Sequence, residues 1–175
     1  MGNQHAWAAP HGAYRCRGDD RWCVISVFSD EEWRRLCQVM GRPEWSDDPE
    51  LASVMNRKKN EEKLNSLIEG WTINYAPEEV ANRLQENGIA AGVVKNGKDI
   101  LEDLQLEYRR HFVPLNHPEI GRYRAEAPSW KLSETPAQLR MPAPCLGEHN
   151  EYVCTRILGM SDEEFVELLG EEVFK

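Results

Sequence analysis

The 175-residue sequence lacks the features that would assign it at once to several large classes of proteins. No run of about 18 apolar residues occurs, so we expect no membrane-spanning helix. The first residues show no basic segment followed by an apolar stretch, which is the pattern of a secretory signal. Basic residues are outnumbered, with 21 Lys and Arg against 30 Asp and Glu, which argues against binding to nucleic acids or anionic membranes.

Signature motifs of common enzyme chemistry are also missing. There is no phosphate-binding GxxxxGK[ST] loop, no GxGxxG, no GxSxG and no HExxH. The five cysteines form no C-x-x-C pair, and their odd number indicates free thiols in a reducing cytoplasm. Their spacing relative to the nearby histidines fits no common zinc pattern, so we expect no metal site. We therefore predict a cytoplasmic protein without a metal.

The N-terminal third of the sequence predicts an irregular lead-in followed by a β-hairpin. Residues 1–12 contain two histidines, a tryptophan and Ala-Ala-Pro, which favours irregular structure. Residues 13–17 and 22–28 flank a Gly-Asp-Asp turn, a pattern typical of paired strands. The second of these runs is apolar almost throughout, which favours a central strand covered on both faces.

Helices follow the hairpin. Ser29 and Glu32 form a capping-box pattern that predicts a helix start. A second helix has an apolar face that includes Leu64 and Ile68, and a third begins at Pro77 and ends near Gly88. A short strand over 89–94 and a short helix or two turns over 96–106 complete this part of the chain.

The composition changes after Arg110. Residues 112–123 alternate loosely and predict a two-stranded ribbon, and residues 129–144, with three prolines, predict an extended connector. Two helices end the chain. The fold class is therefore α+β, divided into a lead-in over 1–12, a small domain over 13–110, and a ribbon, connector and helical tail over 111–175.

Two groups of residues are candidate site residues from their chemistry alone. His5 and His11 flank Trp7 and could orient a substrate carboxylate, although ordinary surface or turn histidines are the favoured alternative. Gly147, Glu148 and His149 precede a helix, and their backbone N–H groups could meet an anion. The favoured alternative for this second group is a simple helix cap built by Asn150 or Glu148.

Several short segments together resemble the class III CoA-transferases, the CaiB/BaiF group that includes formyl-CoA transferase and carnitine CoA-transferase. They follow the family's order over nearly the whole chain: GNQH at 2–5, APHGAY at 9–14, DEEWRRLC at 30–37, GIAAGVV at 88–94 and APCLGEHN at 143–150. The resemblance implies an enzyme that moves CoA from an acyl-CoA thioester to a free carboxylic acid through an aspartyl-CoA intermediate. Coenzyme A is then a substrate, and no tightly bound cofactor is expected.

The resemblance also implies that the sequence is the C-terminal part of such an enzyme. The family's aspartate nucleophile and most of its CoA-binding residues lie in an upstream nucleotide-fold-like domain, and no Asp here matches the nucleophile motif. We therefore expect no catalytic residue in this chain, no activity of the chain alone, and C-terminal helices that pack on the large domain. The partner would be a missing N-terminal half or a separate subunit, and the complete enzyme is expected to be a homodimer.

The same resemblance assigns candidate roles to residues. In formyl-CoA transferase, a glycine-rich loop just before the first small-domain strand moves over the active site. The matching segment here contains His5, Trp7, His11 and Gly12, which we expect to line the acyl or acceptor pocket as a stiffer loop. Gly147, Glu148 and His149 remain candidates for the anion or CoA side.

Two other functions remain open. An acyl-CoA racemase, resembling α-methylacyl-CoA racemase, would share the fold but move a proton at the α-carbon. A non-catalytic small domain acting as a binding or assembly module is the other alternative. The tail argues against the module, because Tyr152, Ile157, Phe165 and Leu168 are expected to form an exposed apolar patch without a partner in the chain.

Overall fold

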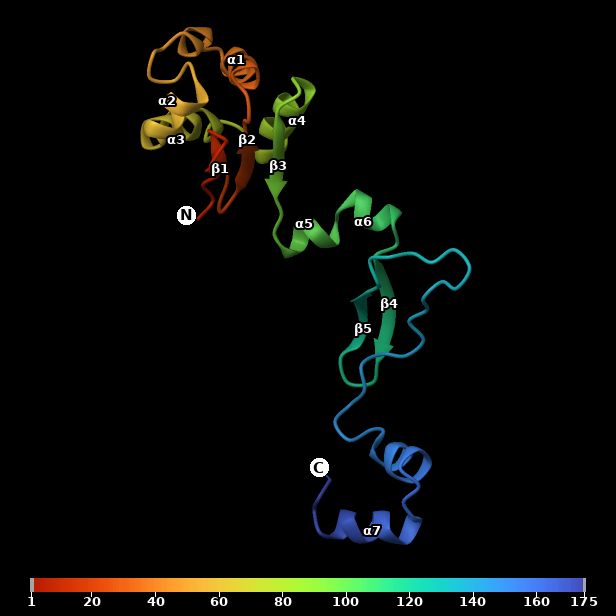
Figure 1. Ribbon diagram of the computed structural model, residues 1–175. Helices are drawn as coiled ribbons and strands as arrows, with labels where there is room; N and C mark the ends of the chain where they lie inside the picture. The colour runs from red at the N-terminus through yellow and green to blue at the C-terminus, as the bar shows by residue number, and fades with distance from the viewer. Residues whose placement is uncertain (1, 175) are drawn as a thin grey trace. The chain divides into compact units, whose positions relative to one another are not determined.

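Three antiparallel strands form the first sheet of the computed structural model, which describes residues 2–174. Strands β1 (His11–Arg15) and β2 (Trp22–Ser26) form the expected hairpin, and β3 (Ala90–Val94) pairs with the other edge of β2. The strand order is therefore β1-β2-β3, as Figure 1 shows. His11 and Gly12 belong to β1, whereas the lead-in was expected to continue through them.

Strand β2 is central, but the prediction that both its faces are covered is wrong. Cys23 and Ile25 are completely buried on one face, whereas Val24, on the other face, is 42% exposed. Val24 lies opposite Ala13 of β1 and Gly92 of β3. The uninterrupted apolar run concealed this difference, because only an alternating pattern distinguishes a half-buried strand from a fully covered one.

Helix α1 (Asp30–Val39) begins at the predicted capping box. The Ser29 hydroxyl accepts a hydrogen bond from the Glu32 backbone N–H at 3.1 Å, and the Glu32 carboxylate accepts one from the Ser29 N–H at 3.2 Å. These two bonds satisfy N–H groups that a helix start would leave without partners. A single 3₁₀ turn (Pro43–Ser46) follows in the turn-rich stretch.

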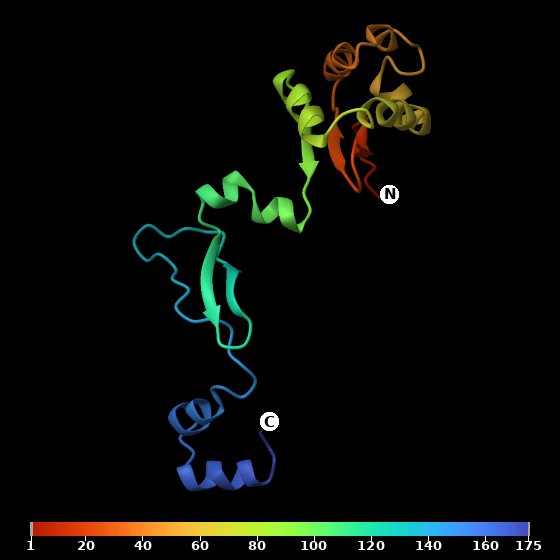
Figure 2. The ribbon, with the colours of Figure 1, turned by 180° about the vertical axis from the view of Figure 1, so that it is seen from behind.

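The second predicted helix is divided in two. Helix α2 (Val54–Lys59) and helix α3 (Glu61–Thr72) are separated at Asn60, whose backbone departs from helical geometry. Helix α4 (Pro77–Glu86) begins at its proline, as predicted. Helix α3 packs on β1, and α4 packs on β2 and β3, an arrangement that Figures 1 and 2 show from opposite sides.

One hydrophobic core lies between this sheet and the helices. Its largest completely buried apolar side chains are those of Ile25, Trp33, Leu36, Leu51, Leu64, Ile68 and Leu84. Arg57 is buried among them, with no exposed side-chain surface. All of these residues belong to the first of two compact units, which ends at Asn96.

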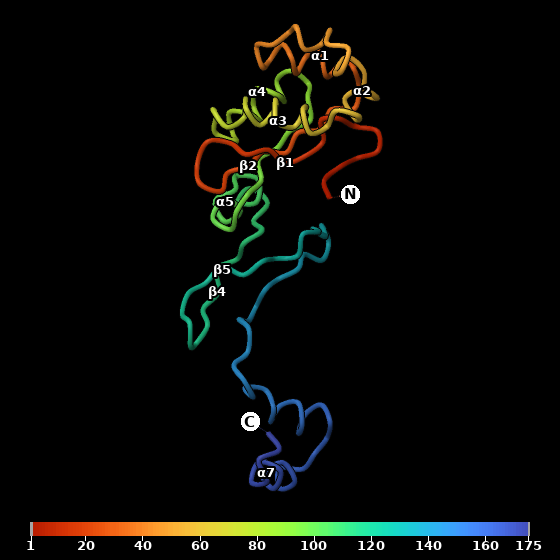
Figure 3. The backbone as a smooth tube through the Cα atoms, turned by 90° about the vertical axis from the view of Figure 1, so that its left-hand side faces the viewer, coloured from red at the N-terminus to blue at the C-terminus, as the bar shows by residue number. Residues whose placement is uncertain are grey.

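The second unit begins at Gly97 and contains little regular structure. Helices α5 (Gly97–Leu101) and α6 (Leu104–Tyr108) precede the predicted ribbon of β4 (Phe112–His117) and β5 (Gly121–Glu126). No helix or strand interrupts residues 129–144, and Figure 3 shows this stretch as a long irregular path after β5. A π-helical turn (Tyr152–Ile157) and helix α7 (Asp162–Gly170) end the described chain.

The helical tail exposes apolar residues, although one residue of the expected patch is buried. Tyr152 and Ile157 are 60% and 63% exposed, as predicted, and Leu168 is half-buried. Phe165 is only 8% exposed, because its ring packs against Phe174 with the centroids 5.4 Å apart. The fold class is α+β, as predicted. No helix among residues 2–174 combines the length and apolar character needed to cross a membrane.

Candidate functional site

The segment before β1 folds back on itself and brings two predicted site residues together. A β-bridge joins His5 to Ala8, and the rings of His5 and His11 lie 5.2 Å apart between centroids. Phe28 meets both rings edge-on, at 5.5 Å from His5 and 6.3 Å from His11. Two imidazoles that are separated in the sequence therefore form one cluster at the edge of the sheet.

Hydrogen bonds to the two rings assign different tautomers to the neutral imidazoles. Nδ1 of His5 accepts a hydrogen bond from the Trp7 backbone N–H at 3.1 Å, so the ring proton is assigned to Nε2. Nδ1 of His11 lies 2.6 Å from the Asn3 carbonyl oxygen, which can only accept, so His11 carries its proton on Nδ1. The pair therefore combines one Nε2–H donor with one Nε2 acceptor.

The base of this segment is anchored to the core. The Ala9 N–H donates to the Val27 carbonyl at 3.0 Å, and the guanidinium Nε of Arg57 donates to the Ala9 carbonyl at 2.7 Å. Arg57 also donates to the Leu51 carbonyl and to the Asp30 carboxylate, each at 3.0 Å. Because the buried guanidinium is held at three points, Ala9, which follows the turn between His5 and Ala8, has a fixed position.

The other two predicted loop residues have different surroundings. Trp7 is 78% exposed. Gly12 provides space beside Tyr14, because a Cβ at this position would lie 3.3 Å from the Tyr14 hydroxyl oxygen. That hydroxyl donates to the Asn65 side-chain oxygen at 2.8 Å. Burial, with the nearby charges of acidic residues, raises the Tyr14 pKa and keeps the hydroxyl protonated as a donor.

The candidate anion site at Gly147 is a closed turn. The N–H of Glu148 donates to the Cys145 carbonyl at 3.1 Å, and the N–H of Asn150 donates to the Gly147 carbonyl at 3.0 Å. The Glu148 carboxylate accepts from the Cys145 N–H at 2.7 Å. The Glu148 carboxylate therefore closes the turn itself, whereas the π-helical turn that follows has no side-chain cap. His149 is exposed beside the turn.

A cysteine–histidine pair in the second unit was not identified from the sequence. Cys145 Sγ lies 3.9 Å from His117 Nε2, and His117 Nδ1 accepts hydrogen bonds from the N–H groups of Glu119 and Ile120. Neutral His117 therefore carries its proton on Nε2 and cannot act as a base toward Cys145. Partial desolvation and the charges of Glu148 and Glu119 raise the Cys145 pKa, so the geometry does not activate this thiol.

The remaining cysteines are free and buried, and burial opposes ionisation of two of them. Burial raises the pKa of Cys23 to about 12 and that of Cys37 to about 12, so both remain protonated thiols at neutral pH. Across residues 2–174, no cluster of three or more His, Cys, Asp or Glu side chains could hold a metal ion.

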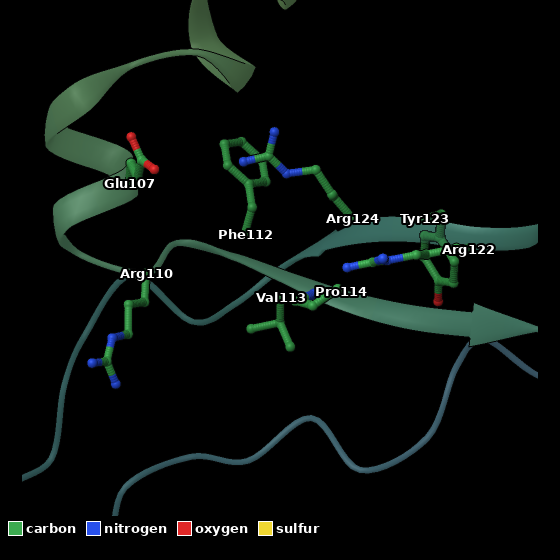
Figure 4. Close-up of a pocket in the computed structure, with 8 residues that line it drawn as sticks. All are labelled: Glu107, Arg110, Phe112, Val113, Pro114, Arg122, Tyr123 and Arg124. Carbon is green, nitrogen blue, oxygen red and sulfur yellow. The ribbon is translucent and has the colours of Figure 1, made fainter.

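A hollow that the sequence did not predict lies on the ribbon of the second unit. It has a volume of about 740 Å³. Figure 4 shows the residues that line it: Glu107, Arg110, Phe112, Val113, Pro114, Arg122, Tyr123 and Arg124. The sequence did contain a signal for this surface. Arg122 and Arg124 alternate with less polar residues along 121–126, and such alternation places both arginines on one face of a strand.

Comparison with known proteins assigns the family. Residues 1–150 match the sequence profile of CoA-transferase family III. The chain belongs to this family. A probable CoA-transferase of Mycobacterium tuberculosis is 38% identical over 170 residues, which cover 97% of this chain and 22% of that protein.

Two relatives have more specific names. The succinyl-CoA–D-citramalate CoA-transferase of Chloroflexus aurantiacus is 30% identical, over 94% of this chain and 41% of its own length. The formyl-CoA:oxalate CoA-transferase of Streptomyces coelicolor is 34% identical, over 93% of this chain and 40% of its own length. The chain therefore spans about two fifths of these two relatives.

A solved structure confirms the fold. A CaiB/BaiF family protein from Brucella suis superimposes with a TM-score of 0.77 at 22% sequence identity, over 90% of this chain and 40% of that protein. At this level of identity the likeness concerns the fold alone.

Proposed function

We propose that this chain is the C-terminal part of a CoA-transferase that moves CoA from an acyl-CoA thioester to a free carboxylic acid. Membership of CoA-transferase family III carries the proposal. The names of two relatives also support it, since each states a CoA thioester and a carboxylic acid. Coenzyme A would be a substrate, exchanged between two acids, rather than a resident cofactor.

The covalent chemistry of this proposal takes place outside the chain. An aspartate of the upstream part attacks the acyl-CoA carbonyl, and the C–S bond breaks to give a mixed anhydride and the CoA thiolate. The thiolate then attacks the aspartyl carbonyl, which releases the first acid and leaves an aspartyl-CoA thioester. The acceptor carboxylate repeats these two steps in the opposite sense, which forms the new acyl-CoA and regenerates the aspartate.

The role of this chain would be to complete and close the acceptor pocket. Such intermediates hydrolyse readily, so water must be excluded while they exist. His5 and His11 offer a donor and an acceptor 5.2 Å apart between ring centroids, a combination that can hold a carboxyl group in either protonation state. Arg57 acts as a positioning residue, because it fixes the Ala9 carbonyl at the base of the loop.

Kinetics of the complete protein test this role. His5→Ala should raise the KM for the acceptor acid by at least about tenfold, because it removes the donor of a hydrogen bond to a charged group, which contributes about 1.5–3 kcal/mol. His11→Ala should raise it less, because a neutral Nε2 acceptor bonds only the protonated acid. His111→Ala in the second unit is the control, and it should leave the KM unchanged. Unchanged acceptor kinetics in both His5 and His11 variants would contradict the assignment.

The racemase alternative is tested with the same preparation. A transferase forms a new acyl-CoA only when a free carboxylic acid is added, whereas a racemase exchanges the α-proton of one acyl-CoA without an acceptor. The names of the relatives favour the transferase. Exposed apolar residues in the tail, including Tyr152 and Ile157, argue against an independent binding module.

Assembly and location complete the proposal. The chain spans about two fifths of two named relatives and about a fifth of the third, which supports a missing N-terminal half or partner subunit. We propose a homodimer for the complete protein and a cytoplasmic location. The free state of all five cysteines is compatible with the reducing conditions of that compartment.

A further inference from the structure

The two faces of the β4–β5 ribbon differ in exposure. On one face Pro114, Asn116, Arg122, Arg124 and Glu126 are exposed and Phe112 is half-buried, whereas on the other face every residue except Gly121 is half-buried. In an antiparallel pair, directly opposed residues lie on the same face. Pro114 is opposite Arg124 and Asn116 is opposite Arg122, so the exposed residues form one continuous surface, which we call the arginine face.

The chain itself covers the opposite face. The N–H of Ala143 donates to the Tyr123 hydroxyl at 3.2 Å, and Cys145 Sγ lies 3.9 Å from His117 Nε2. The extended connector therefore returns along the side of the ribbon that holds His117 and Tyr123. A two-stranded ribbon with one free face is marginally stable, so the arginine face needs a cover of its own.

The arginine face contains two hollows and two exposed arginines that could contact a covering segment. Two hollows, of about 740 and 300 Å³, share Pro114 and Arg122 as lining residues. Arg124 lies over the Phe112 ring, with its guanidinium carbon 5.3 Å from the centroid, and donates to the Leu101 carbonyl at 3.2 Å. Figure 4 shows the Arg124 guanidinium at the Phe112 ring, whereas Arg110 points the other way.

The two guanidiniums on this face retain most of their hydrogen-bonding capacity. Each guanidinium has five N–H donors, and one donor of Arg124 is used by Leu101. Among residues 2–174, no carboxylate forms an ion pair with Arg122 or Arg124, although Glu107 lines the larger hollow and Glu126 lies at the end of the face.

We infer that the arginine face is a docking surface for an acidic protein segment, supplied by the part of the complete protein that this chain does not contain. Aspartate and glutamate side chains are the partners that match paired guanidinium forks beside an aromatic and a proline. At least about three fifths of each named relative lies outside the matched region, so enough chain exists to supply such a segment. The inference concerns assembly, and its test does not require activity.

Arginine-selective labelling with phenylglyoxal tests this inference without any substitution. In the complete protein, Arg122 and Arg124 should react at least about tenfold more slowly than in the 175-residue chain, because guanidiniums held in ion pairs at the rim of an interface are less accessible to the reagent. Raising the salt concentration from about 0.05 to about 0.5 M should reduce this protection, because salt screens the ion pairs. Equal reaction rates in both proteins would overturn the docking surface.

Protection that does not respond to salt would overturn the proposal that the covering segment is acidic, since it would indicate an apolar cover.

A variant tests the same proposal by a second measurement. Replacing both residues, Arg122→Gln with Arg124→Gln, removes the charges and preserves the ribbon's backbone pairing. It should speed amide hydrogen exchange in β5 of the complete protein by about tenfold. Arg34→Gln, at an exposed arginine of α1, is the matched control and should leave that exchange unchanged.

Discussion

The two units of the chain differ in how they exclude water from their apolar residues. The first unit buries one continuous cluster of apolar side chains between its sheet and its helices, which includes Ile25 and Leu84. In the second unit, Cys154 and Phe165 are the only buried hydrophobic residues that the structure describes, and large apolar side chains such as Leu146 and Leu158 are exposed. A domain stabilises itself by burying apolar surface, so we expect the second unit to depend on a surface outside itself, and we propose that the missing part of the complete protein supplies it.

This difference matches the division of labour in the proposed enzyme. A unit that positions a substrate loop needs a rigid base, and Arg57 provides it from inside the core. A ribbon and a helical tail with exposed apolar and cationic faces are suited to binding another part of the protein. Each of the following predictions tests whether stability really divides in this way.

The largest expected effect is at Arg57. Arg57→Ala removes the guanidinium that satisfies the Ala9 and Leu51 carbonyls and the Asp30 carboxylate, so it should destabilise the first unit by about 4 kcal/mol. Urea unfolding measures the change in the free energy of unfolding. Arg34→Ala, at an exposed position, is the control and should change it by less than about 0.5 kcal/mol. A small loss at Arg57 would show that the loop base is not held from the core.

A matched pair of leucines compares the units directly. Leu64→Ala opens a cavity in the first unit and should cost about 3 kcal/mol in the 175-residue chain. Leu158 is 69% exposed, so Leu158→Ala should cost less than about 0.5 kcal/mol in the same chain. In the complete protein the second value should rise to about 2 kcal/mol, because the leucine is then buried. Equal values in both proteins would mean that the tail is not covered.

The smallest expected effect compares two helix caps of the same type. The Ser29 hydroxyl accepts from the Glu32 N–H, and the Ser161 hydroxyl accepts from the Glu164 N–H, both at 3.1 Å. Ser29→Ala should lower the stability of the first unit by about 1 kcal/mol. Ser161→Ala should reduce the helical circular dichroism signal of the isolated chain without moving its main unfolding transition. A shift of that transition would show that α7 unfolds together with the core.

Local signals in the sequence predicted the elements of the fold. The capping box at Ser29, the proline at 77 and the glycine at 88 mark helix ends through backbone hydrogen bonding and conformation, which depend on neighbouring residues. The ribbon and the irregular connector followed from alternation and proline content. The break at Asn60 and the open face of β2 were not predictable in this way, because they depend on packing between elements.

The candidate site was predictable only in part. The resemblance to class III CoA-transferases selected the segment that holds His5 and His11, but not their contact or their opposite tautomers, which require the turn closed by Ala8 and the ring of Phe28. Arg57 showed no signal as an anchor, since a lysine- and arginine-rich helix normally faces solvent. Residues that act through tertiary contacts have no local pattern to reveal them.

The most direct test of the division is amide hydrogen exchange, measured on the 175-residue chain and on the complete protein. We expect β2 and α1 to be protected equally in both, because their core is contained in this chain. The ribbon and α7 should exchange rapidly in the isolated chain and become protected only in the complete protein. Strong protection of the ribbon and α7 in the isolated chain would contradict the account, since it would mean that the second unit stabilises itself.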